Sequence, residues 1–272
     1  MRLQVASLSR SLAFYETVLG LRVLRREGSR VTLGPTGGDT VLIELSERPE
    51  APPAKGRLGL YHFAILLPDR AALGRFLNHL LALGVRAGSA DHLVSEALYL
   101  HDPDGLGIEV YADRPREQWQ VDAGELVMDT LPLDGHGLSE AARGEPWQGM
   151  PAGTRMGHIH LHVGSLDRAD AFYHLALGFD IMVRRYPGAL FLAAGGYHHH
   201  LGVNTWAGPA AEPPADREAR LLEWELVLPT VEDVRNAALS LERAGFPARA
   251  QGESRLVLDP WGVSLRLLPD QP

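Results

Sequence analysis

The chain of 272 residues contains no cysteine. This absence excludes disulfide bonds, thiolate metal sites and a cysteine nucleophile. A transition metal in this protein would therefore need histidine and carboxylate ligands. The chain has enough of both, with 12 histidines and 34 acidic residues.

The sequence also lacks a long hydrophobic run, and its N-terminus has no basic segment followed by an apolar one. A membrane-spanning helix needs roughly 18 or more consecutive apolar residues. The formal net charge is −8, which gives no electrostatic reason to bind nucleic acid or an anionic membrane. We expect a cytoplasmic globular protein without a nucleic acid or membrane partner. The sequence leaves homo-oligomer formation open.

Two common catalytic motifs are missing as well. No glycine-rich turn joins a strand to a helix in the manner of nucleotide-binding folds, and no G-x-S-x-G motif is present. These absences argue against phosphoryl transfer and serine hydrolase chemistry.

The sequence repeats itself at two levels. Residues 7–22, SLSRSLAFYETVLGLR, reappear as SLDRADAFYHLALGFD at 165–180. Within each half, a shorter unit of one strand, one helix and three strands also recurs, as judged from alternating apolar runs, helical periodicity and Gly/Pro punctuation. We place the four units at 3–45, 62–112, 158–205 and 223–268.

These units predict an α+β protein of four βαβββ modules that pair into two domains. The first domain is expected at 1–115 and the second at 155–272, each formed by the two modules of its own half. The segment 116–154 is rich in glycine, proline and acidic residues, and we interpret it as an ordered but irregular linker.

Several motifs carry a family resemblance. The four-module plan and the repeated AFY-x-x-x-LG helix ends resemble the vicinal oxygen chelate superfamily of glyoxalases, bleomycin-resistance proteins and extradiol dioxygenases. The resemblance spans almost the whole chain and implies curved, partly open mixed β-sheets. Three segments are similar to bacterial catechol 2,3-dioxygenase-type proteins: DHLVSEALYLHDPDGLGIEVYADRPREQW at 91–119, GHIHLHVGSLDRADAFY at 157–173 and GGYHHHLGVNTWAG at 195–208.

The resemblance implies a divalent metal, often Fe(II), with Mn, Zn and Ni as alternatives. Its ligands would come from the first strands of two modules and the last strand of the second. In the N-terminal half, His62 and Glu109 occupy such positions. The internal repeat aligns His158 with the position before Met1, so a third histidine ligand is expected just upstream of Met1. Two imidazoles and one carboxylate leave metal positions open for a chelating substrate and dioxygen.

The C-terminal half is expected to be a degenerate copy. Glu223 stands at the position of His62, and Arg266 stands at that of Glu109. A guanidinium group would repel a cation rather than bind it. The N-terminal half is therefore the expected metal domain.

Three further side chains are candidates for catalysis. The imidazole of His92 could exchange a proton with a bound catechol. Tyr99 and Tyr111 could hydrogen-bond a substrate oxygen while their rings wall the pocket. The alternative for both tyrosines is an ordinary place in a half-buried sheet.

The second half also contains clustered histidines. His160 and His162 alternate with His158 along one expected strand, and three more lie at 198–200. His158, His160 and His200 are weak candidates for a second metal site, because this half lacks the closing carboxylate. A hydrogen-bonded structural cluster is the favoured interpretation.

Three functions remain. The first is a non-heme Fe(II) extradiol dioxygenase that uses dioxygen to cleave a small catechol-type aromatic. The second is a glyoxalase-type metal-dependent lyase or isomerase, with Glu44 as an additional carboxylate ligand and base. The third is a non-catalytic protein that binds a small molecule in the same concave sheet.

Overall fold

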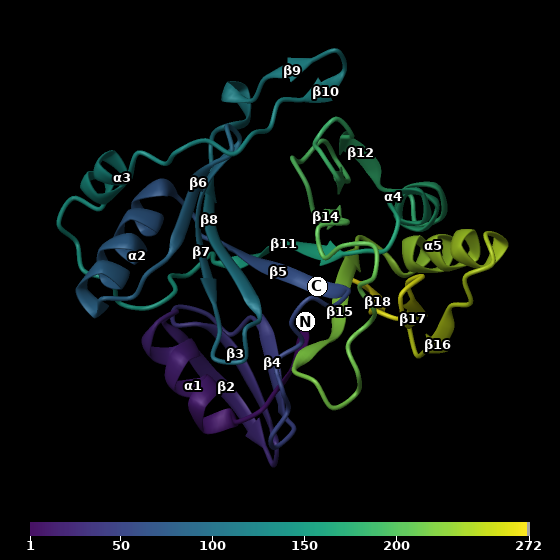
Figure 1. Cartoon of the computed structure of the whole chain (residues 1–272), viewed down its shortest axis with the longest axis horizontal. Coiled ribbons are helices and arrows are strands. Elements are labelled where there is room, and N and C mark those ends of the chain that lie inside the picture. Colours follow the sequence, from purple (N-terminus) through teal and green to yellow (C-terminus); the bar gives the residue numbers. More distant parts are fainter. Residues whose placement is uncertain (271–272) are drawn as a thin grey trace.

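The computed structural model describes residues 1–270. The first two modules follow the predicted order of one strand, one helix and three strands (Figure 1). The first module contains β1 (Arg2–Val5), α1 (Leu8–Thr17), β2 (Leu21–Glu27), β3 (Arg30–Pro35) and β4 (Ile43–Glu47). The second contains β5 (Gly59–Leu66), α2 (Arg70–Leu83), β6 (Gly88–Asp91), β7 (Ser95–His101) and β8 (Gly107–Asp113).

The last two modules repeat this order, with a π-helical turn extending the helix of the third. The third module contains β11 (Arg155–His162), α4 (Leu166–Ala169), η2 (Asp170–Ala176), β12 (Asp180–Val183), β13 (Ala189–Ala193) and β14 (Leu201–Asn204). The fourth contains β15 (Arg220–Leu228), α5 (Val231–Arg243), β16 (Arg249–Gln251), β17 (Ser254–Leu258) and β18 (Ser264–Pro269). The prediction of an α+β fold with four βαβββ modules is confirmed.

Each module helix begins at a polar residue whose side chain accepts a hydrogen bond from a backbone N–H of the first turn. Such caps satisfy donors that have no partner inside the helix. The capping residues are Ser7, Asp69, Ser165 and Thr230. In the second module, Gly84 ends α2 in the left-handed conformation, with φ of 67°.

The modules pair differently from the prediction. One eight-stranded sheet has the order β12-β13-β14-β11-β5-β8-β7-β6, and the other has the order β16-β17-β18-β15-β1-β4-β3-β2. The second module therefore shares a sheet with the third, and the first with the fourth. The prediction that each half forms its own sheet is wrong. The joints are antiparallel pairs of first strands, β5 with β11 and β1 with β15. All four first strands have a similar apolar pattern, so the sequence does not specify which two pair.

The helices lie on the outer sides of the two sheets, and the N-terminus lies close to β15 (Figure 1). One continuous core of buried hydrophobic residues extends through all four modules. Two buried tyrosines also connect successive modules. Tyr15 of α1 donates a hydrogen bond to Asp102 after β7, and Tyr173 of η2 donates one to Asp259 after β17.

The segment between the two halves contains η1 (Arg116–Gln118), β9 (Val121–Asp122), β10 (Glu125–Leu126) and α3 (Gly135–Ala141). The β9–β10 hairpin projects beside β12 (Figure 1). Within residues 1–270, no helix combines the length and apolar character that crossing a membrane requires.

Candidate metal centre and pocket

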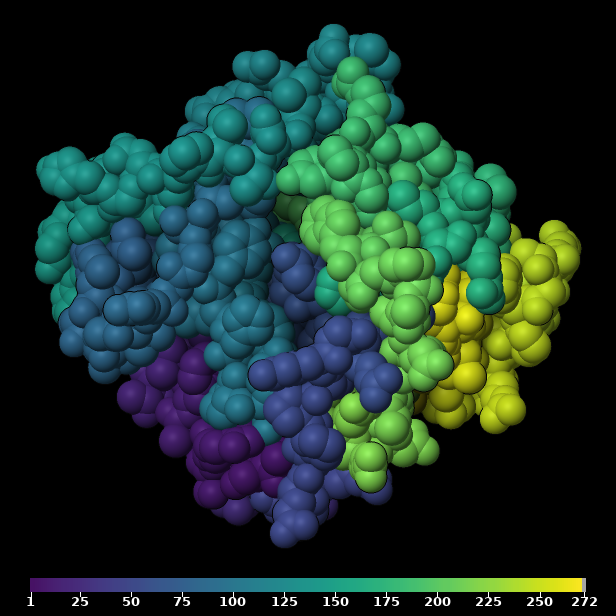
Figure 2. Space-filling view, viewed as in Figure 1, coloured from purple at the N-terminus to yellow at the C-terminus, as the bar shows by residue number. Residues whose placement is uncertain are grey.

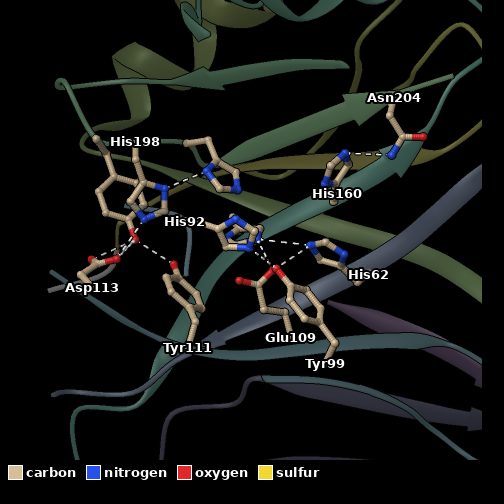
Figure 3. A network of polar contacts seen from close by, with 12 residues as sticks. His62, His92, Tyr99, Glu109, Tyr111, Asp113, His160, His198 and Asn204 are labelled. Carbon is tan, nitrogen blue, oxygen red and sulfur yellow. Dashed lines mark hydrogen bonds and ion pairs between the residues drawn. The ribbon is translucent and has the colours of Figure 1, made fainter. Parts of the chain in front are cut away.

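Three side chains converge on the central strands of the sheet formed by the second and third modules. His62 lies on β5, Glu109 on the parallel strand β8, and His158 on the antiparallel strand β11. His62 Nε2 is 3.0 Å and His158 Nε2 is 3.2 Å from Glu109 Oε2, and the two nitrogens are 3.4 Å apart. Figure 3 shows His62 and Glu109 pointing toward one another. We call these three residues the His-Glu-His cluster.

The His-Glu-His cluster is buried, with exposed fractions of 7% for His62 and 3% for each of the other two residues. Burial alone would raise the pKa of Glu109, but the charge of His158 and hydrogen bonds from both histidines lower it well below its usual value. Burial lowers the pKa of His158 to about 4, against the opposing effect of Glu109. At neutral pH this gives a carboxylate and a neutral imidazole, which are the ionisation states that bind a metal.

The donor atoms of the cluster fit a divalent metal. One ligand atom from each residue lies within 4.8 Å of the other two. Two imidazoles and one carboxylate form the ligand set of many non-heme iron centres that keep coordination positions open. The His158 ring has polar partners only through Nε2, because its buried Nδ1 has no hydrogen-bond partner among residues 1–270.

A histidine upstream of Met1 is not needed to complete the cluster. Met1 precedes β1, which pairs with β4 and β15 in the other sheet. Its amino group lies 4.0 Å from Glu225 of β15 in that sheet. His158 supplies the third side chain instead, because β11 and not β1 is the neighbour of β5.

A cavity of about 290 Å³ opens beside the cluster. In Figure 2 the surface is hollowed between the blue-to-teal atoms of the second module and the green atoms of the third. Several aromatic side chains wall the cavity, as in most small-molecule sites. They are Tyr61, Tyr99, Tyr186, Phe191 and Trp206.

The structure places two of the three predicted catalytic residues at this cavity. His92 Nδ1 is 2.7 Å from the Asp129 carbonyl oxygen, and its Nε2 is 2.6 Å from the Tyr99 hydroxyl. A carbonyl only accepts hydrogen bonds, so Nδ1 of a neutral His92 carries the proton and Tyr99 donates to Nε2. Burial, followed by the charge of Glu109, raises the pKa of Tyr99 well above its usual value. The phenol therefore stays protonated.

Tyr111 lies elsewhere, and its predicted place in the pocket wall is wrong. It is fully buried, it does not line the cavity, and its hydroxyl is 2.7 Å from that of Tyr197. In Figure 3, Tyr111 lies toward Asp113, whereas Tyr99 lies on the other side of Glu109. Its position on β8, two residues after Glu109, places it on the same face of the sheet but deeper inside the protein.

The histidines of the third module do not form a second metal site within the described chain. His158 belongs to the cluster with His62. His160 lines the cavity, and its Nε2 accepts a hydrogen bond from Asn204. His200 Nδ1 accepts one from the backbone N–H of Ala194. Within these residues the weaker second-site alternative has no support, because His158 joins β5 and β8, whereas the favoured interpretation of a hydrogen-bonded cluster fits His160 and His200.

Two functional features were missed by the sequence analysis. His199 is 6% exposed and lines the cavity. The run HHH at 198–200 was its only sequence signal. The segment interpreted as a linker also contributes Met128, Asp129 and Thr130 to the cavity, and Thr130 hydrogen-bonds Tyr186 across it at 2.9 Å.

The other sheet has different side chains at the matching positions. Arg266 donates two hydrogen bonds to Glu223, at 2.9 and 2.8 Å. Glu44, the predicted additional ligand, lies on β4 of this sheet beside Arg2, and so it cannot join His62 and Glu109. The glyoxalase-type assignment of Glu44 to the same metal is therefore wrong.

Comparisons with known proteins agree with this architecture. A family model described as the Glyoxalase/Bleomycin resistance protein/Dioxygenase superfamily matches residues 1–110 and 155–267. A catechol-2,3-dioxygenase of Bacillus subtilis (strain 168) is 47% identical over 264 residues, covering 95% of this chain and 92% of that protein.

Solved structures share the fold at low sequence identity. A proposed dioxygenase from Bacillus subtilis superposes with a TM-score of 0.66 at 14% identity, covering 100% of this chain and 84% of the other. Glyoxalase I from Zea mays gives a TM-score of 0.57 at 17% identity, covering 98% and 90% of the two chains.

Proposed function

Because the chain belongs to the glyoxalase/bleomycin resistance protein/dioxygenase superfamily, we propose that it is an extradiol dioxygenase for catechol-type aromatics. Its metal would be Fe(II), held by His62, Glu109 and His158. The observation that carries this proposal is the convergence of these three side chains beside an aromatic-walled cavity. The 47% identity to a protein named catechol-2,3-dioxygenase supports the choice of substrate class.

When bound at the cluster, ferrous iron would supply chelation of two adjacent hydroxyls and a binding position for dioxygen beside them. The cavity beside His62 and Glu109 is where the substrate would bind. The protein orients the planar substrate between aromatic side chains, with Phe191 and Trp206 among them, and limits the access of water to the ring.

His199 is the base that this cavity offers. Burial, followed by the neighbouring histidines, lowers its pKa well below the usual value, so its imidazole is neutral at neutral pH. Its Nε2 has no hydrogen-bond partner among residues 1–270, whereas Nε2 of His92 already accepts the Tyr99 proton. His199 would accept a hydroxyl proton from the catechol, and the Tyr99 oxygen, whose hydrogen goes to His92, would accept a hydrogen bond from the other substrate hydroxyl.

The two alternative functions have less support. A glyoxalase-type reaction in this pocket would need a second carboxylate ligand, but the group of potential ligand residues found within residues 1–270 contains one carboxylate, Glu109. A purely binding role leaves unexplained why a neutral histidine and a protonated tyrosine flank the metal ligand set.

The test is to load the purified chain with Fe(II) without oxygen, add catechol, and then admit oxygen. We expect one equivalent of dioxygen to be consumed for each ring-opened yellow product. A hemithioacetal serves as the control substrate, and its conversion without oxygen uptake would favour the glyoxalase alternative. Stoichiometric iron binding without turnover of either substrate would favour the binding protein.

A further inference from the structure

A chain of hydrogen bonds runs from the end of β8 to the cavity through two consecutive histidines. Asp113 Oδ1 is 2.9 Å from His198 Nε2, and His198 Nδ1 is 2.7 Å from His199 Nδ1. His198 is fully buried, and the side chain of Asp113 is 25% exposed. Figure 3 shows Asp113 and His198 on the side of Glu109 opposite His62. The metal ligands take no part in these hydrogen bonds.

The chemistry of Asp113 sets the direction of each bond. An ionised carboxylate only accepts hydrogen bonds, so Nε2 of His198 must donate to it. In a neutral imidazole the other nitrogen is then an acceptor, and Nδ1 of His198 receives the proton of His199 Nδ1. Nε2 of His199 is left with a free lone pair at the cavity.

Asp113 is itself held in place. Tyr197 donates its hydroxyl hydrogen to this carboxylate, at 3.1 and 3.0 Å from the two oxygens. The Tyr197 hydroxyl has only one hydrogen, so in the 2.7 Å contact with Tyr111 the donor is Tyr111. Tyr111, which does not reach the pocket, thus supports the Asp113 end of this series of hydrogen bonds.

We propose that Asp113 and His198 are positioning residues that fix the tautomer of His199, keeping its cavity-facing Nε2 unprotonated. This inference deepens the proposed function, in which His199 accepts a proton from the substrate. A histidine in the opposite tautomer would present an N–H to the catechol and could not accept its proton.

The variant Asp113→Asn tests which partner donates in each of these hydrogen bonds. With its NH₂ group at the Oδ1 position beside His198, an asparagine keeps an acceptor for Tyr197 at the Oδ2 position, which lies 3.0 Å from that hydroxyl. That NH₂ group would donate to Nε2 of His198, and both histidines would then reverse, placing a proton on Nε2 of His199. Asp113→Glu keeps a group that only accepts, and Tyr197→Phe removes a contact to the same carboxylate without changing its charge. These two variants are the matched controls.

The direct measurement is the tautomer of His199 in the metal-free protein, read from long-range ¹H–¹⁵N correlations of its ring. His199→Gln identifies the signals by their loss. We expect the Nδ1–H form in the wild type and in Tyr197→Phe, and the Nε2–H form in Asp113→Asn. An Nε2–H form in the wild type would overturn the proposal, and this result does not depend on whether Asp113→Asn folds.

The kinetic measurement uses the iron-loaded protein and catechol. We expect kcat to fall about 100-fold in Asp113→Asn, with KM changed less than about threefold, since a base supplies about 10²–10⁴ of the rate. Asp113→Glu should recover most of the loss. An unchanged kcat in Asp113→Asn would also overturn the proposal. If the wild type does not cleave catechol, the dioxygenase assignment fails. The tautomer measurement still decides whether Asp113 and His198 position His199.

Discussion

The two sheets place different chemistry at matching positions. In one sheet, β5 and β8 pair Phe63 with Ile108, and in the other, β15 and β18 pair Trp224 with Leu265 in the same register. The functional residues are their neighbours in sequence. Each pair consists of the residue just before Phe63 or Trp224 and the residue just after Ile108 or Leu265. They are His62 with Glu109 in the first sheet and Glu223 with Arg266 in the second.

This comparison shows how one backbone serves either a metal centre or a structural ion pair. A carboxylate with two neutral imidazoles leaves one negative charge for a cation. A carboxylate with a bidentate guanidinium is neutralised, and its hydrogen bonds are already satisfied. The second site thus differs at both positions, and its ion pair of Glu223 with Arg266 leaves no uncompensated charge for a cation.

The largest effect should come from removing the carboxylate of the metal centre. Glu109→Gln keeps the size of the side chain but removes its charge, so we expect loss of stoichiometric iron and a fall in kcat/KM of at least about a thousandfold. Elemental analysis and oxygen uptake measure these two quantities. The matched control, Glu223→Gln in the other sheet, should keep its iron, and equal iron loss in both variants would contradict the assignment of the site.

A smaller effect concerns the pH dependence of stability at the two Tyr–Asp contacts. Burial raises the pKa of Asp102 to about 6 from 3.8, although hydrogen bonds from two backbone N–H groups oppose it. The folded protein thus holds this proton more tightly than the unfolded chain. The contribution of Asp102 is fully present below about pH 4 and is lost as the pH rises to about 6.

Asp102→Asn should remove this decline in the free energy of unfolding, which amounts to at most about 3 kcal/mol. Denaturant titrations at several pH values measure it as the difference between wild type and variant. The equivalent Asp259→Asn should act in the same direction, because burial also raises the pKa of Asp259. If the free energy of unfolding changed with pH in the same way in the wild type and in Asp102→Asn, burial would not raise the pKa of this carboxyl.

A third effect concerns the ion pair of the second sheet. Arg266→Met leaves Glu223, which is 5% exposed, with a charge that is no longer neutralised by its bidentate partner. We expect the free energy of unfolding to fall by about 2 kcal/mol, less than for a fully buried pair, because the Arg266 side chain is 22% exposed. The double variant with Glu223→Gln should recover part of this loss in urea denaturation. A double variant less stable than Arg266→Met would contradict this account.

The smallest effect should follow from Tyr99→Phe in the metal sheet. This change removes the hydroxyl that donates to His92 but keeps the ring in the cavity wall. We expect kcat for catechol to fall about tenfold, with iron content unchanged. Tyr61→Phe, at another tyrosine of the same wall, is the control, and an equal loss there would indicate a general effect on the wall.

The sequence was sufficient for the modules and for two of the three converging side chains. Strand and helix periodicity defined each βαβββ unit, and the resemblance to the vicinal oxygen chelate superfamily singled out His62 and Glu109 on the strands that carry them. The internal repeat made His158 the equivalent of a residue before Met1, but β1 lies in the other sheet and β11 is the strand that borders β5. The strand that borders β5 depends on which modules pair, and four similar apolar strands carry no local signal for that choice.

The rest of the pocket was hidden for related reasons. His199 comes from the third module and Thr130 from the irregular segment before it, so neither is near Glu109 in sequence. Irregular backbone has no periodicity that would indicate which side chains face a cavity. His92 and Tyr99 could be predicted from the sequence because they lie seven residues apart, around the start of β7 in the same module.

The tyrosine contacts between successive modules have a consequence for folding. Strand pairing links the first module to the fourth and the second to the third, while Tyr15 and Tyr173 link the first to the second and the third to the fourth. The four modules thus form a closed circuit of contacts. A half of the chain produced alone would expose two unpaired first-strand edges, so we expect the protein to unfold in one cooperative transition rather than half by half.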